Sequence, residues 1–73
     1  MEYFDRESAF EFEMIGNNKI RCWHMTGGSI DITVTIMQDK SLSLTSENGN
    51  ISEENNQKLF NAIDRAYKHW NLI

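Results

Sequence analysis

Strict alternation of apolar and polar residues is the feature that most constrains how this chain can fold. In the stretch AFEFEMI, residues 9–15, three apolar side chains fall on one face and two glutamates on the other. The stretch SIDITVTIM, residues 29–37, alternates in the same way. A period of two with one polar face is typical of a strand that is buried on one side only. We therefore expect an antiparallel sheet with one covered face.

Two further stretches complete the predicted sheet. IRCWHMT at residues 20–26 and SLSLTS at residues 41–46 are read as strands. The turns GNNK at 16–19, Gly27-Gly28 and Gln38-Asp39-Lys40 separate the four stretches. Such turn residues tolerate positive φ and favour hairpins. A three-residue loop at 38–40 is expected to pair Val34 with Leu44. The pattern predicts a four-stranded antiparallel β-meander in the order 1-2-3-4.

The tight turn expected at Gly27-Gly28 sets the predicted register of the middle strands. It pairs Trp23 with Ile32, which directs Trp23 inward and its neighbours Cys22 and His24 outward. A slip of one residue would exchange the two faces of a strand. The predicted core face comprises Phe10, Phe12, Met14, Trp23, Met25, Ile30, Ile32, Val34, Ile36, Leu42 and Leu44.

An apolar stripe at helical spacing predicts one C-terminal helix over residues 53–70. The stripe consists of Leu59, Phe60, Ile63, Ala66, Tyr67 and Trp70. Ser52 is expected as the N-cap, with Glu53 and Glu54 near the positive end of the helix dipole. The stripe is expected to pack on one face of the sheet. The predicted fold is thus α+β, a single small ββββα domain over residues 1–73.

The charge of the chain bears on its partners. The formal net charge is −4, and residues 1–18 carry the whole imbalance, so the rest of the chain is neutral. Direct nucleic-acid binding is not expected, because it needs clustered Lys and Arg to displace counterions. A protein partner is expected instead, and a basic, nucleic-acid-binding protein suits the acidic segment. A chain of 73 residues is too short for a dinucleotide-binding or barrel fold, and no cofactor is expected.

The location of the protein is also constrained by sequence. No apolar run is long enough to cross a membrane, and the first ten residues lack the apolar segment of a signal peptide. The single Cys fits a reducing compartment. We expect a cytoplasmic protein. In size and charge it resembles the small acidic proteins with which bacteriophages and mobile elements inhibit host enzymes, a compositional likeness that transfers no residue role.

The expected register gathers chemistry-bearing side chains on the polar face of the sheet. They are Glu11, Cys22, His24 and Asp31. Imidazole, thiolate and carboxylate are ligands of divalent transition metals, so a metal site is one alternative. Cross-strand pairs of opposite charge add roughly 0.2–1 kcal/mol each to a sheet, and a flat exposed face excludes no water. Simple cross-strand pairing is therefore favoured over a metal site, and we expect no enzymatic activity.

The acidic N-terminal segment is the preferred candidate for partner binding. Aromatic residues interleave with its carboxylates, and aromatics are enriched at binding hot spots. The expected contact residues are Glu2, Tyr3, Phe4, Asp5, Glu7, Glu11 and Glu13. These features favour a small acidic, non-enzymatic binding or regulatory protein, for example an inhibitor of a nucleic-acid-handling host protein.

A second hypothesis rests on the stretch SLSLTS at residues 41–46. This stretch carries no charge and is expected at the edge of the sheet. Natural sheets usually protect their edges with charge, Pro or bulges. An unprotected edge favours pairing with a second copy of the chain or with a strand of a partner. The alternative function is therefore a self-associating structural or assembly subunit, a homodimer paired through Ser41, Ser43 and Thr45.

Overall fold

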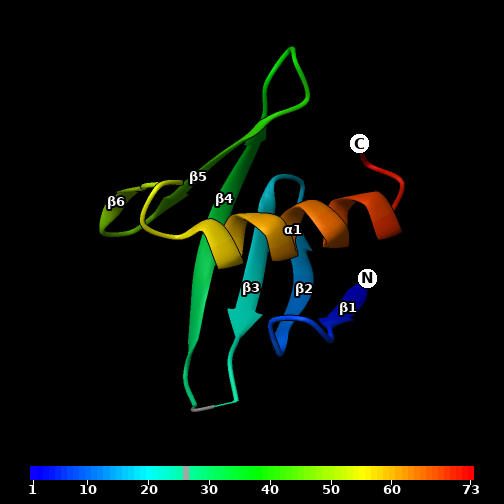
Figure 1. Cartoon of the computed structure of the whole chain (residues 1–73), viewed down its shortest axis with the longest axis vertical. Coiled ribbons are helices and arrows are strands. Elements are labelled where there is room, and N and C mark those ends of the chain that lie inside the picture. Colours follow the sequence, from blue (N-terminus) through cyan, green and yellow to red (C-terminus); the bar gives the residue numbers. More distant parts are fainter. Residues whose placement is uncertain (26) are drawn as a thin grey trace.

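The computed structural model describes residues 1–25 and 27–73. Within these residues the elements are β1 (Glu2–Asp5), β2 (Phe10–Gly16), β3 (Lys19–Trp23), β4 (Ser29–Ile36), β5 (Leu42–Ser46), β6 (Gly49–Ile51) and α1 (Gln57–His69). The strands form one antiparallel sheet in the order β1-β2-β3-β4-β5-β6 (Figure 1). The α+β class, with a C-terminal helix on an antiparallel meander, is confirmed. The predicted number of strands is wrong, because the described sheet has six strands and not four.

The two additional strands lie at the two edges of the sheet. β1 arises from the acidic aromatic segment, in which Tyr3 and Asp5 face α1 while Glu2 and Phe4 are exposed. β6 pairs with β5 across a tight turn, in which Gly49 has a φ of 106°. Only glycine adopts this φ without strain. Strands of three or four residues are too short to show a clear alternation in sequence.

The register around β3 differs from the prediction by a slip that exchanges its faces. Cys22 lies opposite Phe12 on one side and Ile30 on the other, and it is buried, whereas Trp23 lies on the opposite face. The slip against β2 arises at an irregularity of the pairing between Met14 and Gly16. On the other side, β3 ends at Trp23 and β4 begins at Ser29, so the connection is longer than the expected two-residue turn. The end of the predicted strand 20–26, Thr26, lies outside the described residues.

The pairing of β4 with β5 is confirmed. Val34 lies opposite Leu44 and Ile36 opposite Leu42. α1 crosses the middle of the sheet (Figure 1), which leaves the ends of β4 partly uncovered: Ile30 is 50% and Ile36 41% exposed. The core comprises Phe12, Ile20, Cys22, Ile32, Val34, Leu44, Leu59, Phe60, Ala62, Ile63, Ala66 and Tyr67.

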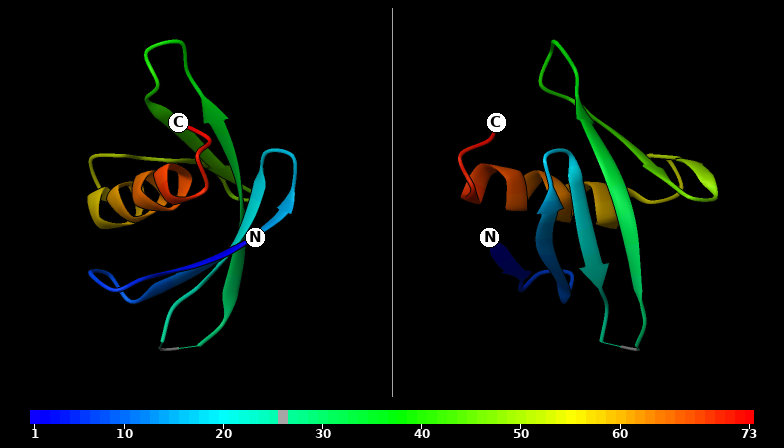
Figure 2. Two further views of the ribbon diagram at one scale, coloured as in Figure 1. Left: turned by 90° about the vertical axis from the view of Figure 1, so that its right-hand side faces the viewer. Right: turned by 180° about the vertical axis from the view of Figure 1, so that it is seen from behind.

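The helix begins later than the sequence pattern predicts. Its first residue is Gln57, and the N-cap residue Asn56 makes no side-chain cap bond. The Ser52 hydroxyl accepts a hydrogen bond of 3.4 Å from the Asn55 backbone, and the Ser52 carbonyl accepts one of 2.9 Å from the Asn56 amide. Ser52 therefore closes a turn that precedes the helix. Seen from behind, the strands lie in front of α1, and their other face carries no further element (Figure 2).

Candidate functional site

The face of the sheet turned away from α1, here called the outer face, carries rows of side chains across the first strands. In one row Phe4 lies opposite Glu11, and Glu11 lies opposite Trp23. In the next row Glu2 lies opposite Glu13. Cross-strand neighbours on one face have Cβ atoms about 5 Å apart, so these side chains adjoin one another. We define the acidic–aromatic patch as Glu2, Phe4, Glu11, Glu13 and Trp23.

Two properties of the acidic–aromatic patch set it apart from an ordinary solvated strand face. Phe4 is 53% exposed, although burying a phenyl ring is favourable. Glu2 and Glu13 are like charges on directly opposite positions, an arrangement that destabilises a sheet. Among the described residues, the carboxylates of Glu2, Glu11 and Glu13 form no ion pair. The patch therefore combines carboxylates that form no ion pair among the described residues with the exposed ring of Phe4.

The nearest arginine, Arg21, lies directly opposite Glu13 of the patch, but its hydrogen bonds go to a residue of β4. Arg21 donates to both carboxylate oxygens of Asp31, at 2.8 and 3.2 Å. The hydrogen bonds from Arg21 lower the pKa of the Asp31 carboxyl, and the same bonds raise the pKa of Arg21. Both side chains are partly exposed, so this pair contributes little to stability. The Glu13 carboxylate contributes to the raised pKa of Arg21, so Arg21 offsets part of the charge of Glu13 and leaves Glu2 and Glu11 unpaired among the described residues.

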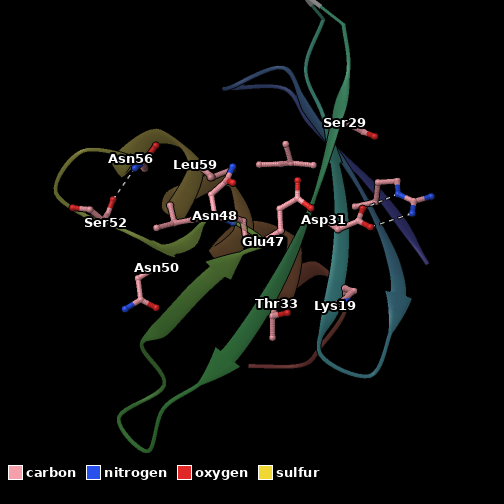
Figure 3. A pocket seen from close by; sticks show the side chains of 14 residues that line it. Lys19, Ser29, Asp31, Thr33, Glu47, Asn48, Asn50, Ser52, Asn56 and Leu59 are labelled. Atoms are coloured by element: carbon pink, nitrogen blue, oxygen red, sulfur yellow. Dashed lines mark hydrogen bonds and ion pairs between the residues drawn. The ribbon is translucent and has the colours of Figure 1, made fainter.

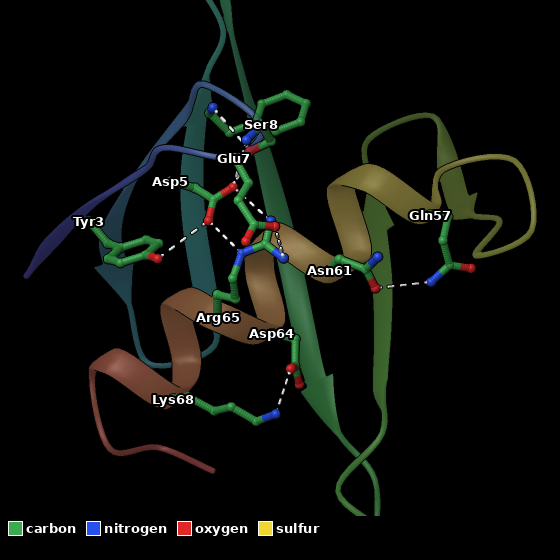
Figure 4. A network of polar contacts seen from close by, with 10 residues as sticks. Tyr3, Asp5, Glu7, Ser8, Gln57, Asn61, Asp64, Arg65 and Lys68 are labelled. Carbon is green, nitrogen blue, oxygen red and sulfur yellow. Dashed lines mark hydrogen bonds and ion pairs between the residues drawn. The ribbon is translucent and has the colours of Figure 1, made fainter.

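Three of the predicted contact residues lie elsewhere, around Arg65 of α1 (Figure 4). Asp5 is 1% exposed and accepts hydrogen bonds from Arg65 Nε at 2.6 Å and Nη2 at 2.8 Å. Ser8 donates to Asp5 from its hydroxyl and its backbone. The Tyr3 hydroxyl donates to Asp5 at 3.3 Å, and Glu7 forms an ion pair with Arg65 at 3.1 Å.

The Arg65 cluster, defined as Tyr3, Asp5, Glu7, Ser8 and Arg65, is internal to the fold. The bonds from Arg65, supported by those from Ser8, lower the pKa of the Asp5 carboxyl although burial opposes this effect. The bonds to Asp5 raise the pKa of Arg65. The cluster ties β1 and the turn that follows it to α1. The structure thus separates the seven predicted contact residues into two groups, of which the patch holds Glu2, Phe4, Glu11 and Glu13.

The predicted row of metal ligands is wrong in its geometry. Cys22 enters the core, and burial raises the pKa of its thiol to about 12. Glu11 lies opposite Trp23 instead of His24, and Asp31 is bonded to Arg21. The His24 ring packs edge-on against Phe10, with centroids 5.0 Å apart. Within the described residues, no three His, Cys, Asp or Glu side chains converge in a way that would hold a metal ion.

The stretch predicted as an unprotected edge is partly covered. β6 lies outside β5, and Thr45 lies opposite Asn50. The expectation that SLSLTS forms the edge is therefore wrong for residues 44–46, while Ser43 pairs only with Thr35 and Ser41 precedes β5. The edges of the described sheet are β1 and β6.

A groove that the sequence did not indicate lies beside the first half of β4 (Figure 3). Ser29, Ile30 and Asp31 line one side, and the β5–β6 turn and the start of α1 line the other. The sequence indicates this groove only through the lengths of the strands, because β4 extends past the end of β5. Trp23 was likewise missed as a surface residue, because the predicted register turned it inward.

Comparison with known protein families, with curated proteins and with solved structures finds no match to this chain. In the part of the chain that the structure describes, no helix has the length and apolar character needed to cross a membrane.

Proposed function

We propose that this chain is a small, non-enzymatic binding protein that docks through the acidic–aromatic patch onto a basic surface of a partner protein. The observation that carries the proposal is the row Phe4, Glu11, Trp23 on a face that α1 leaves uncovered. In this row a carboxylate with no ion-pair partner among the described residues lies between two aromatic side chains. Aromatic side chains supply contact area at interfaces, while charges steer the encounter and fix its register.

The chemistry of the patch favours a partner that handles nucleic acid. Surfaces that bind nucleic acid carry clustered Lys and Arg, which complement carboxylates as well as phosphates. A protein that occupies such a surface competes with nucleic acid and acts as an inhibitor. We propose a cytoplasmic protein of the kind with which phages and mobile elements inhibit host enzymes.

A pull-down from the source cells with matched charge variants tests the proposal. The double variant Glu11→Lys, Glu13→Lys is expected to lose the partner, because it reverses the charge of the patch. The double variant Asp39→Lys, Asp64→Lys makes the same change of net charge in the turn after β4 and on α1, outside the patch, and is expected to retain the partner. Equal capture by both variants would contradict the proposal.

The aromatic component requires a separate variant. Phe4→Ala removes an exposed ring from the patch and is expected to weaken binding about tenfold or more, as hot-spot truncations do. Met37→Ala removes a similarly exposed apolar side chain beyond the end of β4 and serves as the control. An affinity for the captured partner that is unchanged by Phe4→Ala would restrict the proposal to charge alone and refute the role of the ring.

A further inference from the structure

β4 is longer than the strand beside it, and this difference leaves part of its backbone unpaired. β4 pairs with β3 through residues 29–33 and with β5 through residues 33–36. Residues 29–32 therefore have a neighbouring strand on one side only. This open edge lies within the groove described above and not at the outer border of the sheet (Figure 3).

The backbone groups that face the open side can be assigned from two hydrogen bonds. The Val34 N–H donates to the Asn18 carbonyl, on the β3 side, at 2.7 Å, and the Met37 N–H donates to the Ser41 carbonyl, on the β5 side, at 2.9 Å. Along a strand these groups alternate between the two sides. The N–H and C=O groups of Ser29 and Asp31 therefore point into the groove, and no backbone partner for them lies in the described part of the chain.

The groove is lined by the apolar side chains of Ile30 and Leu59, and the carboxylate of Glu47 lies at its border. Ile30 is half exposed and lies on the same side of the sheet as Leu59 of α1. Figure 3 shows Glu47 between Asn48 and Asp31, at the mouth of the groove.

The charges that line the groove cancel, Lys19 and Arg21 against Asp31 and Glu47, and two carboxylates of the adjoining loop make its surroundings acidic. The charge of Asp31 is already matched by Arg21. Glu47 has no ion-pair partner among the described residues, and Glu53 and Glu54 lie in the adjoining loop. Lys19 is the single lining cation, apart from Arg21, among the described residues.

We propose that the open edge of β4 accepts an extended, basic segment of a partner protein as an added strand. The segment pairs its backbone with Ser29 and Asp31, places an apolar side chain over Ile30, and directs a Lys or Arg toward Glu47. It takes the position that β5 would occupy if the chain did not turn away after Ser46. Strand addition of this kind draws affinity from backbone hydrogen bonds and specificity from alternate side chains.

A second copy of this chain suits the open edge less well than a basic partner does. A symmetric pair of copies places identical surfaces against each other. Glu47 and the acidic loop beside the groove of one copy would then face the same groups of the other, and like charges in contact oppose association. The acidic surroundings of the groove therefore favour a basic segment.

The test uses a synthetic six-residue peptide of alternating Val and Lys, added to the isotope-labelled protein. Amide hydrogen exchange at Ser29 and Asp31 is expected to slow by about tenfold or more at saturation, because both N–H groups become hydrogen-bonded. A peptide methylated on its backbone nitrogens is expected not to bind, since it cannot donate to the edge. Unchanged exchange at both amides, or equal binding of the methylated peptide, would overturn the proposal.

Matched variants of β4 identify the site. Ile30→Lys and Ile36→Lys introduce the same charge at two similarly exposed positions on one face of one strand, but only Ile30 lies in the groove. Ile30→Lys is expected to weaken peptide binding about tenfold, a loss typical of one buried apolar contact, and Ile36→Lys to leave it unchanged. Circular dichroism of both variants checks the fold. A dimer of the protein alone that Ile30→Lys dissociates would show that a second copy occupies the edge, and would overturn the proposal.

This site is separate from the acidic–aromatic patch, so the two proposals can fail independently. The Glu11→Lys, Glu13→Lys variant is expected to retain the slowed exchange at Ser29 and Asp31 with the peptide. Loss of that protection in this variant would show that the patch, and not the open edge, holds the peptide.

Discussion

Asp5 and Arg65 lie 60 positions apart in the chain and meet through two hydrogen bonds of 2.6 and 2.8 Å. Asp5 is almost completely buried, whereas Arg65 is about one third exposed. Such a paired geometry is the strongest form of a carboxylate–guanidinium contact. It fixes β1 and the turn after it to α1, and it explains why the acidic N-terminal segment is part of the fold and not a free tail.

Removing the charge of Asp5 is expected to destabilise the protein. Asp5→Asn removes the buried carboxylate from Arg65, which keeps the exposed Glu7, and is expected to cost about 2–3 kcal/mol, less than for a fully buried pair because Arg65 reaches solvent. Glu7→Gln, at an exposed carboxylate on the same arginine, is expected to change the free energy of unfolding by less than about 0.5 kcal/mol. Urea denaturation measures both. Similar losses for the two variants would show that the Asp5–Arg65 pair is not specially stabilising.

The same pair predicts how stability depends on pH. The pKa of Asp5 in the folded protein lies below its ordinary value of 3.8, so the unfolded chain binds a proton more readily. The stabilisation by Asp5 is therefore complete well above pH 3.8 and declines as the pH falls below that value. The fall in stability below about pH 4 should be smaller in Asp5→Asn than in the wild type. Parallel pH profiles of the two proteins would contradict the assignment.

Removing the Tyr67 hydroxyl is expected to increase the free energy of unfolding, unlike the substitution of Asp5. Its hydroxyl is buried and, among the described residues, has no hydrogen-bond partner, and burial raises the pKa of the phenol. Tyr67→Phe keeps the ring and removes the unsatisfied group, so it is expected to raise the free energy of unfolding by about 1 kcal/mol. Thermal denaturation measures this change. A clear loss of stability would indicate that the hydroxyl is hydrogen-bonded in solution.

The Cys22 thiol is expected to be inert in the folded protein. It is buried in the core, and its pKa of about 12 leaves almost no thiolate at neutral pH. Iodoacetamide should modify it far more slowly in buffer than in urea, where the chain is unfolded. Equal rates in the two conditions would show that Cys22 is exposed, as the register predicted from the sequence requires.

The fold was predicted where the alternation was long, and missed where it was short. Eight residues of β4 suffice to indicate a strand and its inward face, and the short loop after it set the correct pairing of Val34 with Leu44. The three residues of β6 contain a single inward apolar side chain, Ile51, which no pattern distinguishes from a loop. The helix was found from its stripe, but its start was misplaced because Ser52 closes a turn of its own.

The candidate site was found only in part, because its assembly depends on register. The sequence identified the carboxylates and Phe4, since charge and aromatic content can be read directly. Trp23 lies beside them only because its neighbour Cys22 occupies the core position. Since β3 has apolar residues at the successive positions 22 and 23, its sequence pattern does not decide which of the two faces inward. The contact of Asp5 with Arg65 joins opposite ends of the chain, which a local pattern does not reveal.

Mapping the footprint of the captured partner on this protein tests the central claim most directly. Amide hydrogen exchange of the complex is predicted to slow at Phe4, Glu11 and Trp23 on the outer face, while the exposed side of α1 around Asn61 remains unchanged. The Glu11→Lys, Glu13→Lys variant should lose this footprint, and the Asp39→Lys, Asp64→Lys variant should keep it. Protection centred on α1, with the outer face unaffected, would contradict the account.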